Sequence, residues 1–138
     1  MTGPDFLDTN ILVYAYDVGS PDKQRIAKEL VIRAVSGDGV ISAQVLAEFA
    51  ATLLHKITPT PATEEVAAIL DALGPITLIK PDGELVRRAV DARKSYGLPF
   101  YDGLIVAAAE RASSRRIFSE DLNTGQIYFG TPVVNPFH

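Results

Sequence analysis

Short apolar segments alternate with longer amphipathic segments along almost the whole of this 138-residue chain. The short segments predict strands at 5–8, 40–42, 76–80 and 115–119, with 132–136 as a candidate fifth. The longer ones predict helices at 11–16, 21–35, 43–56, 63–73, 82–96 and 99–112. Strands joined through helices require crossover connections. We therefore predict an α/β fold with a mainly parallel central sheet of four to five strands, flanked by helices.

Length and composition bound the class of protein. A chain of this length suits one domain, which we place over residues 1–138. Hydrophobic residues make up 47% of the chain and charged residues 22%, as is usual for a globular protein. No apolar run reaches the roughly 18 residues of a membrane span, and the N-terminus lacks a signal-peptide pattern. We expect a cytoplasmic protein that does not enter a membrane.

The side chains that could hold a metal ion are limited. The chain has no cysteine, and its only histidines are His55 and His138. These counts exclude disulfides, thiolate zinc sites, a cysteine nucleophile and a histidine-rich site, so oxygen atoms must bind any metal. The net charge of −4 weakens non-specific attraction to nucleic acid. It does not exclude a nuclease, because a bound cation inverts the local charge of an acidic cluster.

Seven of the 17 acidic residues lie on predicted helices with neighbours typical of a solvated face. This group comprises Glu29, Glu64, Glu65, Asp71, Glu84, Asp91 and Glu110. Asp102 differs, because it lies in the apolar stretch "LPFYDGLIVAAA" with no accompanying polar stripe. A first-turn carboxylate stabilised by the helix dipole would explain it. Since burying an unpaired carboxylate costs several kcal/mol, we favour a functional role.

Glu48 is the only charged residue between Ser42 and His55, in the stretch "VLAEFAATLL". Gln44 and Thr52 lie four positions before and after it, so a thin polar stripe could carry Glu48 to solvent. The local sequence therefore leaves a structural and a functional role for Glu48 equally open.

Two more acids follow predicted strands. Asp8 lies in "FLDTNILVYAYD", where it could cap the next helix, and Asp121 follows "IFSE", where it could belong to a turn. Ligands of open α/β sheets bind at the carboxyl ends of the strands, which is where both acids fall. With Glu48 and Asp102 they describe an all-oxygen site suited to Mg²⁺ or Mn²⁺. We interpret Asp8 as a metal ligand and assign the capping role to Thr9 or Asn10.

Four stretches, "FLDTNILVYAYD", "AQVLAEF", "YDGLIVAAA" and "IFSEDLNTGQ", resemble the motifs of PIN-domain ribonucleases. More narrowly, the chain resembles VapC-type toxins of bacterial or archaeal toxin–antitoxin pairs. The resemblance covers nearly the whole chain, with the motifs in the family's order. It implies an acidic quartet of Asp8, Glu48, Asp102 and Asp121, and supporting roles for Thr9, Asn10, Ser119 and Glu120.

The same resemblance implies an activity and partners. The protein would be an Mg²⁺- or Mn²⁺-dependent endoribonuclease and the toxin of a type II toxin–antitoxin system, with Asp8 and Asp102 as primary metal ligands. Glu48 and Asp121 would act directly, through water or on a second ion, and Glu120 could exchange roles with Asp121. A small antitoxin would cover the active-site groove, and a homodimer is expected. The number of metal ions and the RNA cleaved stay open.

Local cations would have to bind the RNA of such a nuclease, because the net charge does not. The candidates are Arg87, Arg88, Arg93, Lys94, Arg111, Arg115 and Arg116, although each taken singly suits an ordinary surface position.

Three other functions compete with the nuclease. A catalytically silent PIN-like interaction module would keep the fold and show no response to metal. A receiver domain would need a lysine where Phe118 and Ser119 stand, and a haloacid-dehalogenase-type phosphatase would need an aspartate in place of Asn10. The two phosphoryl-transfer alternatives therefore fit less well than the nuclease.

Overall fold

A six-stranded sheet forms the centre of the protein in the computed structural model, which describes residues 2–138. The strand order is β3-β2-β1-β4-β6-β5. Neighbouring strands run parallel except at the edge, where β5 is antiparallel to β6. The strands are β1 (Asp5–Leu7), β2 (Gly39–Ser42), β3 (Thr77–Ile79), β4 (Arg116–Phe118), β5 (Ile127–Tyr128) and β6 (Thr131–Val134).

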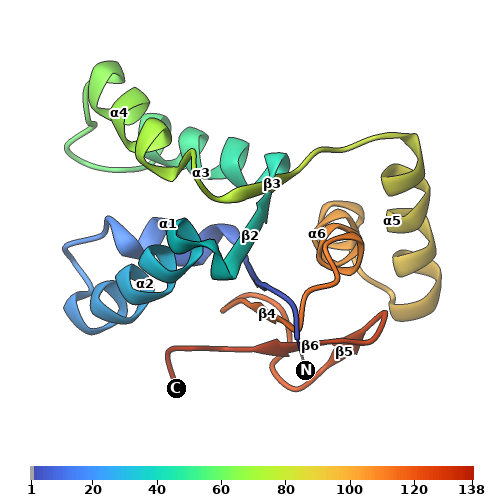
Figure 1. The fold of residues 1–138 in the computed structure, drawn as a ribbon. Helices are drawn as coiled ribbons and strands as arrows, with labels where there is room; N and C mark the ends of the chain where they lie inside the picture. The colour runs from blue at the N-terminus through green and yellow to red at the C-terminus, as the bar shows by residue number, and fades with distance from the viewer. Residues whose placement is uncertain (1) are drawn as a thin grey trace.

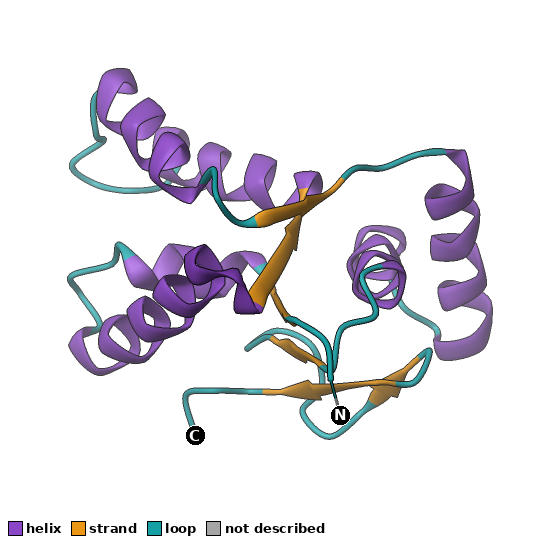
Figure 2. Cartoon of the chain, viewed as in Figure 1, coloured by secondary structure: helices purple, strands orange, loops and turns teal. Residues whose placement is uncertain are grey.

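Helices cover both sides of the sheet (Figure 2). Near strands β1 and β2, α1 and α2 lie on one side, and α5 and α6 lie on the other (Figure 1). α1 packs against α2 and α3, and α5 packs along α6. The helices are α1 (Thr9–Ala15), α2 (Pro21–Arg33), α3 (Ala43–His55), α4 (Thr63–Leu73), α5 (Gly83–Tyr96) and α6 (Phe100–Arg111).

The predicted α/β class and mainly parallel sheet are confirmed, but the predicted number of strands was too low. The structure has six strands because residues 127–128 form β5, which hydrogen-bonds to β6 as a short hairpin. A two-residue strand is too short to show the alternation by which strands are recognised. The candidate fifth strand, predicted at 132–136, is observed as β6 at Thr131–Val134.

The core lies between the sheet and its helices. Phe6 of β1, Val40 of β2 and Ile117 of β4 are neighbours across the sheet, and all three are fully buried. Each such side chain contributes about 1.5–3 kcal/mol on burial. The apolar α6 lies between α5 and the sheet (Figure 1), and six of its twelve residues are buried. This position explains why Asp102 lacks polar neighbours in the sequence.

The junction between α2 and β2 is tight. A short kinked segment, η1 (Ala34–Asp38), connects them, and within it Gly37 takes a φ of 112°, in the region that favours glycine. A Cβ added to Gly39, the first residue of β2, would lie 2.4 Å from the Cβ of Ala34 and 2.7 Å from its Cα. Glycine at position 39 is therefore required by close packing.

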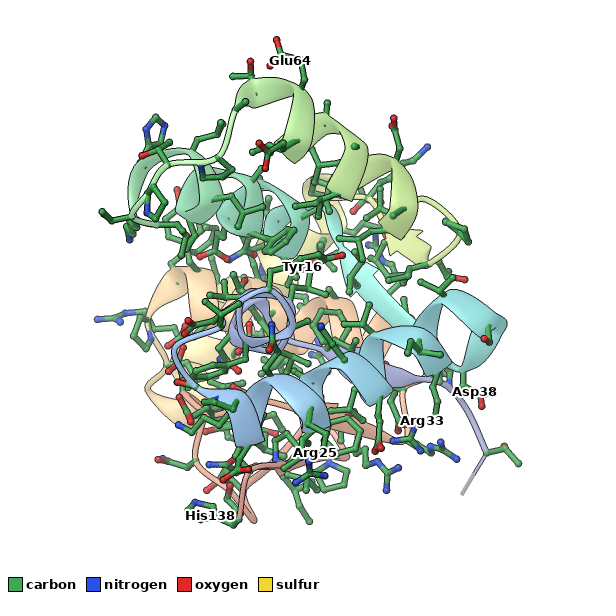
Figure 3. All side chains as sticks on the ribbon, turned by 90° about the vertical axis from the view of Figure 1, so that its left-hand side faces the viewer. Tyr16, Arg25, Arg33, Asp38, Glu64 and His138 are labelled. Carbon is green, nitrogen blue, oxygen red and sulfur yellow. The ribbon has the colours of Figure 1, made fainter. Side chains whose placement is uncertain are left out.

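Within residues 2–138, no helix combines the length and the hydropathy needed to cross a membrane. Glu64, one of the acids assigned to solvated helix faces, is exposed at the outer end of α4 (Figure 3).

Candidate active site

Asp8 follows β1 directly and is buried, with 8% of its surface exposed. Its Oδ1 accepts a hydrogen bond from the backbone N–H of Thr9 at 2.8 Å, and its Oδ2 accepts one from Ser119 Oγ at 2.7 Å. Asp8 is therefore itself the N-cap of α1. Our assignment of the capping role to Thr9 or Asn10 was wrong, because the extended backbone at the end of β1 places the Asp8 carboxylate next to the first free N–H of the helix.

Ser119 connects Asp8 to the loop that follows β4. Strands β1 and β4 are parallel neighbours, so their carboxyl ends meet. Besides donating to Asp8, the buried Ser119 Oγ accepts hydrogen bonds from the N–H groups of Asp121 at 3.2 Å and Leu122 at 3.1 Å. A single hydroxyl therefore fixes both the carboxylate of Asp8 and the backbone that carries Asp121.

Asn10, in the first turn of α1, bridges to the same loop. Its Nδ2 donates to Asp121 Oδ2 at 3.1 Å, and its Oδ1 accepts from the N–H of Glu120 at 3.1 Å. Thr9 faces the other way, and its Oγ1 lies 3.4 Å from Glu48 Oε1 on α3. The two polar residues after Asp8 thus hold the acids on either side of it.

Glu48 is exposed on α3, and the polar stripe anticipated from the sequence is present. Gln44 Nε2 donates to Glu48 Oε1 at 3.2 Å and to the backbone carbonyl of Tyr101 at 3.1 Å. Thr52 Oγ1 donates to the backbone carbonyl of Glu48 at 2.8 Å. Gln44 therefore connects α3 to the first turn of α6, beside Asp102. The sequence placed Gln44 in the stripe but gave no sign of this connection.

The charges of the acids act on one another. Burial, followed by the nearby charges of Asp121 and Glu48, raises the pKa of Asp8 to about 6 from its ordinary value of 3.8. The half-buried Asp102, in the first turn of α6, also has a raised pKa, through burial and then the charge of Asp121. All four carboxylates are thus connected to at least one other, by charge or by a shared polar neighbour.

Glu120 belongs to a different set of contacts. It accepts a hydrogen bond from Tyr14 Oη at 2.7 Å and pairs with the ammonium group of Lys23. Although burial opposes its ionisation, these two donors hold the pKa of Glu120 below its usual value. The ammonium of Lys23 also lies over the ring of Tyr14, 4.7 Å from its centroid.

The four acids share one property, which is that none forms an ion pair with a cationic side chain in residues 2–138. Five acids elsewhere in the protein do have such partners: Asp5, Asp82, Asp91, Glu110 and Glu120. The charges of Asp121 and Glu48 repel that of Asp8, and a divalent cation would neutralise them. Their oxygen atoms suit Mg²⁺ or Mn²⁺. As the side chains stand, however, the described residues contain no group of three or more acidic or histidine side chains arranged to hold a metal ion.

A cavity of about 570 Å³ opens beside the acids, between α1 and α3. Glu48 and Asp121 line the end nearest to Asp8, and Val13 and Ala51 form part of its walls. Tyr16, at the end of α1, points toward α3, where its ring centroid lies 5.7 Å from that of Phe49 (Figure 3).

The profile of the PIN domain family matches residues 6–130, which is most of the chain and includes all four acids. The chain belongs to the PIN domain family. PIN domains are generally nucleases that depend on divalent metal. A search of curated protein sequences returns no significant match.

Solved structures with the same fold include toxins of toxin–antitoxin pairs. A chain of a toxin–antitoxin complex from Klebsiella pneumoniae superposes with a TM-score of 0.70 at 20% identity, covering 96% of this PIN domain and 97% of that chain. VapC20 of Mycobacterium tuberculosis, described as a sarcin–ricin loop cleaving toxin, gives 0.65 at 20% identity over 85% and 89%. VapBC2 of Rickettsia felis, bound to a promoter DNA fragment, gives 0.65 at 18% identity over 94% and 96%. Structural similarity at 18–20% sequence identity shows that these proteins share the fold of this chain.

Several arginines suggested from the sequence as RNA contacts have other roles in this PIN domain. Arg115 and Arg116 pair with Asp5 at the start of β1, at the opposite end of the strand from Asp8. Although burial opposes ionisation of Asp5, the two guanidinium groups hold its pKa below the usual value. Arg88 binds Glu110 through two hydrogen bonds, and Arg111 binds Asp82 in the same way. These contacts join elements of the fold, and the sequence gave no indication of them.

Proposed function

We propose that this PIN domain is an Mg²⁺- or Mn²⁺-dependent endoribonuclease and the toxin component of a type II toxin–antitoxin system. The proposal rests on one observation: hydrogen bonds through Ser119, Asn10, Thr9 and Gln44 connect Asp8, Asp121 and Glu48 to one another and to the first turn of α6, which carries Asp102. None of the four acids has a cationic partner in the described chain. Family membership supports nuclease chemistry, and the toxin folds among the structural neighbours support the biological class.

In this proposal Asp8 and Asp102 are the primary metal ligands, and Glu48 and Asp121 complete the site directly or through water. When bound, Mg²⁺ or Mn²⁺ activates water and stabilises the charge that develops at the cleaved phosphodiester. Ser119 orients the Asp8 carboxylate, and Asn10 orients that of Asp121. Thr9 and Gln44 position Glu48. Glu120, which already has two donors, tethers the loop and binds no metal.

The partners follow from the same proposal. A small antitoxin, produced with the toxin in the cytoplasm, would cover the acids and the cavity between α1 and α3. The neighbours from Klebsiella pneumoniae and Rickettsia felis are toxin–antitoxin complexes, which supports an antitoxin partner. We also propose that the toxin is a homodimer.

The experiment is cleavage of total cellular RNA by the purified protein. We expect cleavage in Mn²⁺ or Mg²⁺, none in excess EDTA, and none by Asp102→Asn in either condition, because that variant lacks one primary ligand. Asp71→Asn is the matched control, since Asp71 is an exposed acid of α4, and it should cleave as the wild type does. Cleavage that persists in excess EDTA, or in folded Asp102→Asn, would refute the proposal.

A catalytically silent interaction module is the second candidate, and one observation favours it. The acids of the described residues are not arranged to hold a metal ion as they stand. Thermal unfolding with and without Mn²⁺ separates the two functions, because a ligand that binds the folded state raises the unfolding temperature. An unchanged unfolding temperature in millimolar Mn²⁺ would favour the silent module.

A further inference from the structure

The cavity beside the acids extends along α3 away from Glu48. Lys56 lies eight positions after Glu48, which corresponds to about 12 Å along a helix axis. Both line the same cavity, and Val13 and Ala51 lie in its walls between them. An RNA strand whose backbone reached the acids could therefore continue along this groove toward Lys56.

Lys56 is the only cationic residue among those that line the cavity within the described part of the chain. Its side chain is exposed and forms no ion pair in residues 2–138, unlike Lys23 near the other end, which Glu120 neutralises. Asp17 also lines the cavity, but its Oδ1 accepts a hydrogen bond from the N–H of Gly19 at 2.9 Å and makes no ion pair with Lys56. The ammonium group of Lys56 is therefore free to bind an anion.

We infer that Lys56 and the groove between α1 and α3 form a subsite for an RNA phosphate further along the strand than the one held at the acids. The inference rests on the proposed function. The protein is acidic overall, so its attraction for a polyanion must come from local cations. Apart from Lys56, the groove offers acidic, neutral polar and apolar side chains. The apolar walls suit the sugar and base of the strand. An acidic protein segment would meet the same ammonium group, but it would gain nothing from the metal-binding acids at the other end.

The test measures cleavage of a fluorescein-labelled single-stranded RNA oligonucleotide in Mn²⁺ over a range of KCl concentrations. For Lys56→Met we expect KM to rise severalfold with kcat unchanged, because a phosphate away from the cleaved bond is held equally in ground and transition states. The plot of log(kcat/KM) against log[KCl] should become shallower by about 0.7, the value for one phosphate contact on a single strand. Lys56→Arg should restore both values.

Lys28→Met is the matched control, because Lys28 is exposed on α2, does not line the groove and forms no ion pair in the described residues. It should keep the wild-type KM and salt slope. If the wild type cleaves and Lys56→Met has the wild-type salt slope, the subsite is wrong and the proposed function stands. A groove that binds a protein segment instead of RNA would also leave the salt slope of Lys56→Met unchanged, and the RNA subsite would be wrong in that case too. If the wild type shows no metal-dependent cleavage, both proposals fall together.

Discussion

Asp8 is both a helix cap and a buried carboxylate in the candidate site. The sequence presented these as alternatives, and the structure shows that one oxygen faces the N–H of Thr9 while the other faces Ser119. The capping hydrogen bond orients the carboxylate of Asp8 and leaves it beside the other acids. A residue at the junction of a strand and a helix can therefore cap the helix and belong to a functional site at once, because the end of the strand is where both roles are placed.

Burial of Asp8 has a consequence for stability. Its pKa is about 6 in the folded protein and 3.8 as the ordinary value, so folding favours the protonated form. The stabilisation from protonated Asp8 is complete below about pH 4 and is lost as the pH rises through 6. In EDTA, raising the pH from 5 to 7 should therefore lower the free energy of unfolding of the wild type by about 1 kcal/mol more than that of Asp8→Asn. Urea unfolding at the two pH values measures this.

The comparison is between the pH dependences of the two proteins, since the substitution also alters the hydrogen bonds to Thr9 and Ser119 at every pH. Asp71→Asn, on the exposed face of α4, should follow the wild type. If the free energy of unfolding depends on pH in the same way in the wild type and in Asp8→Asn, the pKa of Asp8 is not raised in the metal-free protein, and the prediction is wrong.

At the scale of elements, the loop after β4 is tied to α1 and α2 through Glu120, Tyr14 and Lys23. Glu120 and Asp121 are adjacent, but only Asp121 lacks a cationic partner. We expect Asp121→Asn to lower Mn²⁺ affinity and cleavage by tenfold or more, and Glu120→Gln to keep the Mn²⁺ affinity within about threefold. Calorimetric titration with Mn²⁺ measures both. If Glu120→Gln lost more Mn²⁺ affinity than Asp121→Asn, Glu120 and not Asp121 would be the metal ligand.

The junction of α2 and β2 provides a test of packing. Gly39→Ala should destabilise the protein by about 1–3 kcal/mol, because the new methyl group would meet the backbone of Ala34 in a buried site. Gly83→Ala is the matched control: no atom lies within 4 Å of its added Cβ, and alanine is the better helix former. Chemical unfolding should show Gly83→Ala to be neutral or slightly stabilising. Equal stability of the two variants would contradict the tight junction.

Elements with a local signal were predictable from the sequence, and contacts between distant residues were not. The helix of residues 21–33 and its neighbours followed from apolar periodicity, and β5 was missed because two residues carry no period. The pairing of Glu120 with Tyr14 and Lys23 spans 106 and 97 positions. No window of local sequence contains such pairs, so the separation of Glu120 from Asp121 required the fold.

At the scale of the whole molecule, the acids of the site differ from the others in how their charges act on one another. Five of the 17 acids of the protein pair with arginines or lysines. Within residues 2–138, Asp8, Glu48, Asp102 and Asp121 do not, and burial together with neighbouring acids raises the pKa of Asp8 and of Asp102. Their apolar surroundings and strand-end positions are visible in the sequence. The hydrogen bonds that connect them join residues 39 to 111 positions apart, so the contacts among them depend on the fold.

Calorimetric titration of Mn²⁺ into the metal-free wild type and into Asp8→Asn and Asp102→Asn, at pH 7, tests the central claim most directly. We predict saturable binding by the wild type, release of protons as Asp8 gives up its raised pKa, and a loss of affinity of tenfold or more in each variant. Asp71→Asn should bind as the wild type does. Absence of saturable binding by the wild type, or wild-type affinity in both Asp8→Asn and Asp102→Asn, would contradict a metal site at the carboxyl ends of β1 and β4.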